Sequence, residues 1–304
     1  MVGRRIVVVF TAVAGLSACS LFVSLDGLST SSAVDSAPGG DAGPEASSDA
    51  RPSTDGGFGS VGDGATSSAY AAAILADSPV GYWRFDDISG PTVRDEIGNA
   101  HPGTIYGGVQ LGVPGAEGTA FTFDGNKGCI DVGPNFLFAA PAPFSVEVWV
   151  KPVDFAAYKF LVSTETNIPS GLRDGWSIAV ASTGQASLEA WSSVTDASAF
   201  IIGAYSQNTP GSAPPLLLNT WTQIDTTYDG NGVGEIWFDG VLRDHATEPG
   251  GLRGDRGALS FGCRGATTPT PVGSFNGSID EISIFDKVLT REQILAHKAA
   301  HLAK

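Results

Sequence analysis

Carboxylates are the first side chains to consider for chemistry in this sequence. Two carboxyl groups on either side of a glycosidic bond can cleave it, one as the acid and the other as the base or nucleophile. Glu147 lies in the alternating run FSVEVWVKP (144–152), where no other carboxylate stands two or four residues away on the same face. The run SIDEIS (278–283) is the nearest approach to a catalytic strand, and no Gly-x-Ser-x-Gly nucleophile elbow occurs. We therefore expect no enzymatic activity.

Histidines are the next candidates, because two histidines four residues apart on a helix can share a metal ion. His297 and His301 have this spacing in the stretch HKAAH near the C-terminus. The stretch lacks the glutamate of the zinc-protease motif. We therefore interpret this helix face as a solvated surface rather than a metal site.

The charge of the chain limits the partners that it can attract. The sequence has 32 acidic and 17 basic residues, which gives a net charge of −15 at pH 7. A protein of this sign repels the phosphates of DNA and RNA. We therefore expect no nucleic-acid partner.

The N-terminus, MVGRRIVVVFTAVAGLSAC (1–19), has the three parts of an export signal. Two arginines are followed by an apolar run too short to span a bilayer as a helix, and then by small residues. The end of this segment, LSAC (16–19), resembles the lipobox of bacterial lipoproteins. The resemblance implies a lipid anchor on Cys19 in the cell envelope, and Ser20 fits sorting to the outer membrane. An ordinary signal peptide with a chance cysteine is the alternative.

If Cys19 carries lipid, two cysteines remain, Cys129 and Cys263. An exported chain folds in an oxidising compartment, so we predict a disulfide between them. It would close a loop of about 134 residues, for which the chain-entropy model gives roughly 5 kcal/mol as an upper estimate. Two buried free thiols are the alternative.

The composition changes after the signal segment. Residues 20–68 are mostly Asp, Ala, Gly, Pro and Ser, with little that a core could bury. Such a stretch cannot offset its own ordering entropy, so we predict a solvated tether. Residues 69–304 then form the expected folded domain.

Within that domain, short apolar runs separated by Gly, Pro and Asp predict an all-β sandwich. In the run 144–152 every second residue is apolar, so one set of side chains should face a core. The other predicted strands are 80–87, 119–125, 129–133, 159–164, 175–182, 187–193, 199–205, 258–264 and 278–287.

A hairpin is expected where WTQIDTTYDG (221–230) and EIWFDG (235–240) flank an Asp-Gly-Asn-Gly stretch. Gly and Asn tolerate the positive φ that tight hairpins require. Asp239-Gly240 predicts a second turn directly after the hairpin.

Only the C-terminal end is predicted to be helical. Thr290 and Gln293 have the spacing of a capping box. A modest apolar stripe could come from Ile294, Leu295, Ala299 and Leu302.

Several separated motifs follow one another along the chain in a defined order. The first is GYWRFDD (81–87), which is followed by VRDEIGNAHPGTIYGG (93–108), FTFDG (121–125) and FSVEVWVKP (144–152). The set is completed by the paired Trp and Asp-Gly strands of 221–240 and by FNGSIDEISIFDKVLTREQI (275–294). As a set, covering about residues 70–302, they resemble the concanavalin A-like, LamG-type jelly-roll domains of bacterial surface proteins. Asp225 departs from the resemblance, because the family usually has a small apolar residue there. The Pro-rich insert at 206–218 has no family guidance.

The resemblance implies two antiparallel sheets packed face to face, with the concave sheet often serving as a ligand surface. Members bind glycans, proteins or sialylated surfaces, and some bind Ca²⁺. Relatives that hydrolyse β-glucans carry Glu-x-Asp-x-x-Glu on one strand, and the stretch 278–283 lacks both of those Glu positions. Asp86 and Asp280 match family Asp positions and are our candidates for a structural Ca²⁺ site. The alternative is that Asp86 caps a turn and Asp280 binds backbone amides.

Aromatic residues could form a sugar-stacking platform, because their faces match the apolar faces of pyranoses. Trp191 and Tyr205 are the candidates for this role, although core packing is the alternative for both. The tryptophans expected to pack in the core or on the sheets are Trp83, Trp149, Trp221 and Trp237.

Together these observations predict an exported, lipid-anchored envelope protein with a non-catalytic LamG-like sandwich that binds a glycan or a surface protein. A glycan hydrolase of the same fold and a purely structural envelope component are the alternatives.

Overall fold

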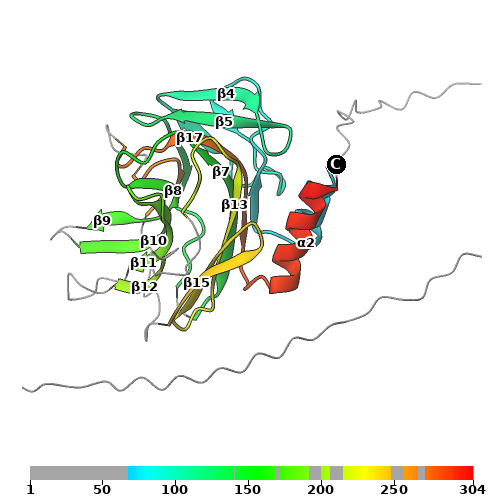
Figure 1. The fold of residues 1–304 in the computed structure, drawn as a ribbon. Coiled ribbons are helices and arrows are strands. Elements are labelled where there is room, and N and C mark those ends of the chain that lie inside the picture. The colour runs from blue at the N-terminus through cyan, green and yellow to red at the C-terminus, as the bar shows by residue number, and fades with distance from the viewer. Residues whose placement is uncertain are drawn as a thin grey trace, which may run out of the picture. The chain divides into compact units, whose positions relative to one another are not determined.

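The computed structural model places the described residues within one compact unit, Asp63–Lys304 (Figure 1). Cys19 and the predicted tether up to residue 67 lie outside the described residues. No described helix is long and apolar enough to cross a membrane. The structure describes residues 68–139, 141–168, 172–191, 200–205, 215–247, 257–265 and 271–303. Within these ranges, the backbone but not the side chain is described at 167, 168, 172, 173, 191 and 200–205.

In the described part of the chain, two antiparallel sheets of eight and nine strands pack face to face, which confirms the predicted sandwich. The order of the eight-stranded sheet is β15 (Val241–Thr247), β14 (Val233–Phe238), β13 (Thr222–Tyr228), β7 (Phe144–Pro152), β17 (Asn276–Phe285), β5 (Thr119–Asp124) and β4 (Val109–Pro114), with β1 (Gly81–Trp83) also paired to β17.

The nine-stranded sheet forms the second layer. Its order is β12 (Phe200–Tyr205), β11 (Ala186–Trp191), β10 (Leu172–Val180), β8 (Lys159–Ser163), β16 (Leu259–Phe261), β6 (Cys129–Gly133), β3 (Gly103–Tyr106) and β2 (Thr92–Val93), with β9 (Thr166–Ile168) paired to β10.

The main core lies between the inner faces of the two sheets. Strand β7 supplies four fully buried side chains to it, so the predicted alternation is confirmed. Burying one such side chain contributes about 1.5–3 kcal/mol relative to leaving it exposed. The four are Phe144, Val146, Val148 and Val150.

The predicted hairpin is formed by β13 and β14, which pair in antiparallel register. Asp229 Oδ1 accepts hydrogen bonds from the backbone N–H groups of Asn231 and Val233, both at 2.8 Å. The second turn also forms, with Asp239 at φ 51° and Gly240 at φ 76°. Glycine relieves the steric cost of the positive φ in this turn.

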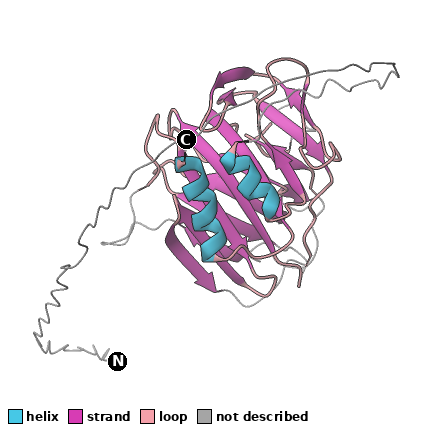
Figure 2. Ribbon diagram, turned by 90° about the vertical axis from the view of Figure 1, so that its right-hand side faces the viewer, coloured by secondary structure: helices cyan, strands magenta, loops and turns pink. Residues whose placement is uncertain are grey.

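Two helices, α1 (Ala69–Ala76) and α2 (Arg291–Leu302), lie side by side on the outer face of the eight-stranded sheet (Figure 2). The expectation that only the C-terminal end is helical was wrong. Segment α1 is apolar all round, so it has no amphipathic stripe that the sequence could reveal. It is held by its N-cap Ser68, whose hydroxyl accepts the backbone N–H of Ala71.

The capping box of α2 is confirmed, because Thr290 and Gln293 exchange both of its hydrogen bonds. The predicted apolar stripe is only partly correct. Ile294 is fully buried, but Ala299 and Leu302 are exposed. The second buried side chain of the helix is instead His297, because the face of the sheet beneath α2 carries acids.

Candidate functional site

The outer face of the nine-stranded sheet carries polar side chains aligned across five strands. Glu189 pairs with Ser177, Ser177 with Ser163, Ser163 with Ser260, and Ser260 with Asp131. Because side chains alternate along a strand, residues paired in register share one face. We call these five residues the polar row. Its three serines are fully buried, so each hydroxyl needs a hydrogen-bond partner.

The partners of the serines are backbone groups and one acid. Ser260 Oγ donates to the carbonyls of Ser163 and Cys263, at 3.2 and 3.1 Å. Ser163 Oγ accepts the backbone N–H of Glu165 at 3.0 Å, and Ser177 Oγ donates to Glu165 Oε2 at 3.2 Å. The hydroxyls therefore lock β8, β10 and β16 together and position Glu165 beside the row.

Two buried acids at the row are held by side chains from neighbouring segments. Glu165 forms an ion pair with Arg264, whose guanidinium also lies over the Phe160 ring at 5.0 Å. The Tyr158 hydroxyl donates to Glu189. Burial and then the charge of Glu189 raise the pKa of Tyr158, so its hydroxyl stays protonated.

A pocket of about 470 Å³ opens beside the polar row. Small-molecule sites have volumes of about 300–1,000 Å³. We call it the Arg264 pocket. Within it, Lys159 Nζ donates to the Gly125 carbonyl at 3.2 Å. The lining includes Asn126, Tyr158, Lys159, Phe160, Arg264 and Val272.

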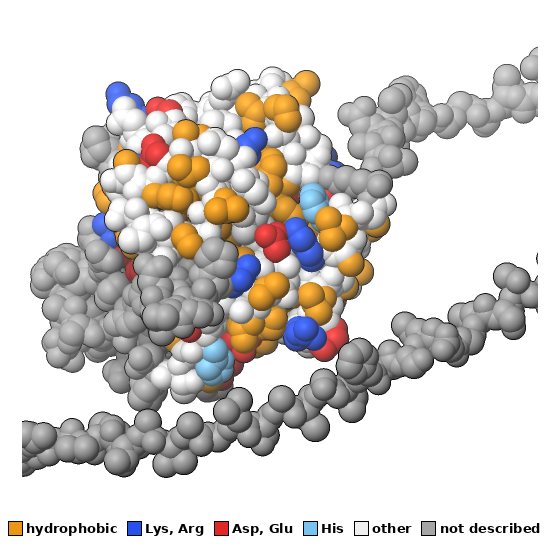
Figure 3. Space-filling view, in the orientation of Figure 1, with side chains coloured by type: hydrophobic (Ala, Val, Ile, Leu, Met, Phe, Trp, Pro, Cys, Tyr) orange, Lys and Arg blue, Asp and Glu red, His pale blue; other side chains and the backbone are white. Residues whose placement is uncertain are grey.

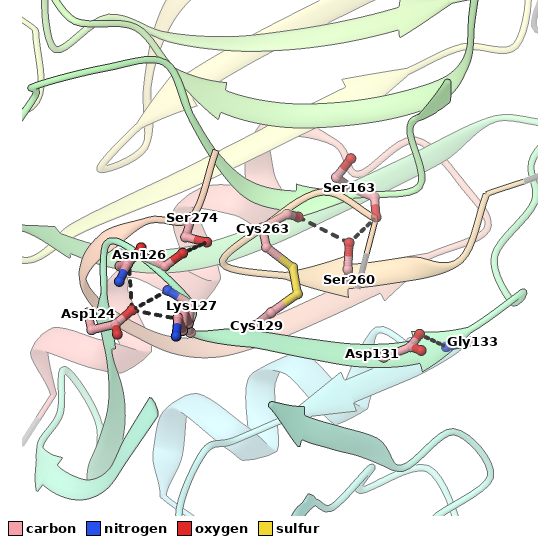
Figure 4. The surroundings of a disulfide bond; sticks show 11 residues. Asp124, Asn126, Lys127, Cys129, Asp131, Gly133, Ser163, Ser260, Cys263 and Ser274 are labelled. Carbon is pink, nitrogen blue, oxygen red and sulfur yellow. Dashed lines mark hydrogen bonds between the residues drawn. A yellow bond between two sulfur atoms is a disulfide. The ribbon is translucent and has the colours of Figure 1, made fainter. Parts of the chain in front are cut away.

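A disulfide joins Cys129 in β6 to Cys263 directly after β16, which confirms the predicted pair (Figure 4). The two Cα atoms are 5.3 Å apart. Both cysteines are almost fully buried on the face that carries the polar row. Because Arg264 follows Cys263 directly, the disulfide also holds the backbone that presents the guanidinium to Glu165.

The turn between β5 and β6, which is drawn in Figure 4, contributes Gly125 and Asn126 to the lining of the pocket. Asp124 Oδ1 accepts three backbone N–H groups, from Asn126, Lys127 and Gly128, at 2.8–2.9 Å. These hydrogen bonds fix the turn that carries Gly125 and Asn126 to the pocket.

The candidate calcium residues Asp86 and Asp280 both bind the loop at 115–119. Asp86 Oδ1 accepts the backbone N–H of Thr119 at 2.9 Å, and Asp280 Oδ2 accepts that of Glu117 at 3.0 Å. This contact of Asp280 matches the alternative interpretation, in which its carboxylate binds backbone amides. Its second oxygen, Oδ1, is buried with no hydrogen-bond partner in the described part of the chain.

The oxygens around this loop suit a hard cation. Asp280 Oδ2 and the backbone carbonyl oxygens of Glu117 and Thr119 all lie close to Gly115, whereas Asp86 forms an ion pair with Arg84 at 2.8 Å. Carboxylates mixed with loop carbonyls are the ligands that Ca²⁺ prefers. Among the described residues, no group of three or more His, Cys, Asp or Glu side chains is placed to hold a metal. Backbone carbonyls would therefore have to complete the site.

A second acidic cluster lies under the helices, on the opposite side of the molecule's core. Glu147 is fully buried and stands directly across from Asp225 in the neighbouring strand β13. The ring of His297 bridges Glu147 Oε2 at 2.8 Å and Asp77 Oδ2 at 3.0 Å. Gln223 Nε2 donates to Glu147 Oε1 at 2.8 Å.

The interpretation of the HKAAH face as a solvated surface was wrong. His297 is fully buried, and His301 binds Glu117 at 2.6 Å with its ring 4.2 Å from that of Trp149. The sheet offers these histidines acidic and aromatic partners that lie more than 140 positions away in the sequence. Their role in the described structure is to fasten α2 to the sheet.

The electrostatics of this cluster separate two neighbouring acids. Burial raises the pKa of Glu147, but the hydrogen bond and charge of His297 outweigh burial and hold it below its ordinary value. Burial lowers the pKa of His297, but Glu147 and Asp77 outweigh it and leave that pKa raised. Burial and the charge of Glu147 raise the pKa of Asp225 well above its ordinary value.

Replacing Asp225 by asparagine should therefore stabilise the protein at pH 8. An acid whose pKa is raised by folding loses stability as the pH rises above its unfolded pKa, about 3.9 for Asp. An amide of the same shape avoids this cost, so we expect a gain of about 1–3 kcal/mol at pH 8, shrinking toward pH 4. Urea unfolding at both pH values measures it.

The exposed Asp286, changed to asparagine, is the matched control and should show no such gain. An Asp225→Asn variant that is less stable than the wild type at pH 8 would contradict the assignment of a buried, repelled carboxyl.

The comparison with known sequences decides the family. A sequence profile described as "Concanavalin A-like lectin/glucanases superfamily" matches residues 108–295. The chain belongs to this superfamily. Among curated proteins, none is matched by the sequence.

Solved structures of similar fold include binding domains. Domain 4 of AbnA, a GH43 extracellular arabinanase from Geobacillus stearothermophilus in complex with arabinotriose, is 21% identical, with a TM-score of 0.51, over 72% of this chain and 98% of that one. The binding domain of Paraclostridial Mosquitocidal Protein 1 is 16% identical, with a TM-score of 0.57, over 75% and 53%.

A structure of botulinum neurotoxin type C, described as dependent on two ganglioside molecules for cell entry, is 17% identical, with a TM-score of 0.55, over 76% of this chain and 52% of that one. The concanavalin A-like chain thus spans about half the length of these toxin structures. At such identities the likeness establishes the fold alone.

For the two aromatic candidates of this concanavalin A-like domain, the structure describes the backbone but not the side chains. Trp191 and Tyr205 belong to β11 and β12, and their side chains lie outside the described residues. The described tryptophans behave as predicted: Trp221 is partly buried, and Trp83, Trp149 and Trp237 are buried.

Sequence reasoning missed the acids and cations of the site in this superfamily member. Glu189 alternates with apolar residues in SLEAWSS, and Arg264 follows a predicted disulfide cysteine. Those two signals were present. The pairing with Tyr158 and Glu165 was not readable, because these residues are 31 and 99 positions away.

Proposed function

We propose that this protein is exported, carries lipid on Cys19, and displays a non-catalytic concanavalin A-like module that binds carbohydrate at the Arg264 pocket, beside the buried polar row. The observation that carries the proposal is this pocket, in which the lining residues Tyr158 and Arg264 are held in place by the buried acids Glu189 and Glu165.

A carbohydrate fits this chemistry better than an apolar ligand does. Sugar hydroxyls need hydrogen-bonding partners, and the apolar face of a pyranose packs on an aromatic ring. The Tyr158 side chain supplies such a ring, 37% exposed at the pocket. The arabinotriose in the structure of the similar arabinanase domain supports the same ligand class.

Glycan hydrolysis is the alternative function, and one specific observation favours it. Glu165 and Glu189 both lie on the ligand-facing side of one sheet, which is where a glycosidase would place two carboxyls. Each carboxyl is, however, bound by a neighbour, Arg264 for Glu165 and Tyr158 for Glu189. This arrangement holds the acids in place rather than leaving one as a proton donor, and it favours binding over cleavage.

A glycan array with the full-length chain in detergent tests the proposal. Once a ligand is found, Tyr158→Ala should weaken its binding roughly tenfold, about 1.4 kcal/mol. Tyr106→Ala is the matched control, because Tyr106 is a half-exposed tyrosine of the same sheet that does not line the pocket.

Release of reducing ends from the bound glycan would replace the proposal with the hydrolase. If no glycan on the array binds, the alternative of a purely structural envelope component would be favoured instead.

The lipid anchor has its own test. Cells that express the chain and are fed an alkyne fatty acid should label the wild type, whereas Cys19→Ala should stay unlabelled and leave the membrane fraction. Two or three acyl chains hold a protein on a bilayer durably. Equal labelling of the wild type and of Cys19→Ala would show that Cys19 does not carry the lipid.

Calcium is proposed as a structural ion held by Asp86, Asp280 and carbonyls of the 115–119 loop. When bound, it would supply positive charge to the buried Asp280, whose pKa burial and the charge of Glu281 raise well above the ordinary value. At 100 times its Kd, a ligand that binds only the folded state stabilises it by about 2.7 kcal/mol. We expect the melting temperature to rise with Ca²⁺ and to fall with EDTA, and Asp280→Asn should abolish the difference. No shift in the wild type would remove the site.

A further inference from the structure

The lining of the Arg264 pocket carries basic side chains in an acidic protein. In the described part of the chain, its lining contains Lys159 and Arg264 and has no Asp or Glu, although the chain as a whole carries −15. On the face shown in Figure 3, basic and acidic side chains are scattered among apolar and uncharged ones. A pocket with two cations and no acid in its lining therefore differs from that surface.

The two cations are not equivalent. Arg264 is neutralised by its ion pair with the buried Glu165. Lys159 is half-buried, and one of the three N–H donors of its ammonium reaches the Gly125 carbonyl. Lys159 thus has donors left for a ligand.

Besides Glu165 and Glu189, which bind Arg264 and Tyr158, the acid Asp154 lies near Lys159 outside the lining, and it is occupied by other donors. The backbone N–H of Ala156 binds its Oδ1 at 3.0 Å, and the Asn276 amide binds its Oδ2. These hydrogen bonds, the strongest influences on Asp154, lower its pKa, and Lys159 contributes least. The ammonium of Lys159 therefore has no dedicated carboxylate in the described structure.

The other walls of the pocket suit a sugar ring. Tyr158 and Val272 are 37% and 45% exposed, so both offer apolar surface to a ligand. The exposed Asn126 adds a side-chain amide that can bind hydroxyls. In a half-enclosed site an ammonium attracts an anion more strongly than it does in open water.

We infer that the Arg264 pocket binds a sugar with an anionic group, in which Lys159 is the counter-ion and Tyr158 packs on the ring. This inference rests on the proposed function and names the ligand class of the same site. A carboxylate and a sulfate share the required chemistry, so the experiment must separate them.

Calorimetric titration of the full-length chain in detergent provides the test. The probes are trigalacturonic acid, its methyl ester, galactotriose and sulfated galactotriose, so that charge and its source vary while the ring stays similar. We expect the acid to bind at least roughly tenfold more tightly than the neutral ester. This preference should weaken as the salt concentration rises. The sulfated and carboxylated probes show which anion the pocket takes.

Lys159→Gln should remove most of the preference for the charged probe and leave binding of the ester nearly unchanged. Lys127→Gln is the matched control, because Lys127 is exposed in the adjacent turn and does not line the pocket. Equal binding of acid and ester, or a site that takes only neutral glycans of the array, overturns the inference while the proposed function stands. Absence of any glycan ligand overturns both.

Discussion

Replacing Cys129 and Cys263 together by alanine should lower the free energy of unfolding by about 3–5 kcal/mol. The disulfide spans a sequence separation of 134 residues, so it removes much of the freedom of the unfolded chain. Both sulfurs are also buried, and smaller side chains would leave a gap beside β6 and β16. Urea unfolding of the oxidised wild type and of the double variant measures the difference.

Reductant provides the internal control for this experiment. It should destabilise the wild type toward the level of the double variant, and it should not change the double variant itself. A loss below about 1 kcal/mol would show that the unfolded chain gains little freedom when the bond is removed, against the chain-entropy account.

The second large effect is expected from Arg264→Gln, which should cost about 3–5 kcal/mol of stability. The substitution removes the Arg264 charge that pairs with Glu165, which is only 2% exposed. An uncompensated buried charge is far more costly than the net contribution of the ion pair itself. Removing both charges, in Arg264→Gln with Glu165→Gln, should therefore recover much of the loss.

The four proteins of this double-mutant cycle can be compared by urea unfolding at pH 7. Arg94→Gln serves as the control, because Arg94 is 64% exposed, its pair with Glu96 spans 3.9 Å, and exposed pairs contribute about 0–1 kcal/mol. If the double variant were no more stable than Arg264→Gln alone, the cost would come from lost packing on Phe160 rather than from the unpaired acid.

The two clusters of buried acids have different consequences. On the helix side, Glu147 and His297 are tied to one another and hold α2 in place. On the outer face of the nine-stranded sheet, Glu165 and Glu189 are also buried, but their partners Arg264 and Tyr158 line a pocket on the surface. This difference in access is why we place the function at the second cluster.

Local patterns in the sequence were sufficient for much of the fold. The alternation in β7, the turns that bound β14 and the cap of α2 all depend on residues within a few positions of each other. Short-range sterics and hydrogen bonds decide such features, so they can be read without knowing the rest of the chain. The two cysteines could be paired because only one pair remained once Cys19 was assigned to lipid.

Weakly patterned segments were not predicted. Strands β4 and β15 lie at the edges of the eight-stranded sheet and have no buried side chains, only partly buried and exposed ones. Helix α1 has no polar face at all. In each case the element forms because a neighbouring surface is available, and the sequence of the element alone carries no sign of that surface.

By itself, then, the sequence determined the sandwich and the disulfide partners, and it predicts export to the cell envelope. Tertiary structure alone decided which polar residues meet: Glu189 reaches Asp131 through three serines on three other strands. It also placed Asp225 opposite Glu147. The reason is that strand register, which aligns side chains from distant segments, is set by the packing of whole sheets rather than by any one strand.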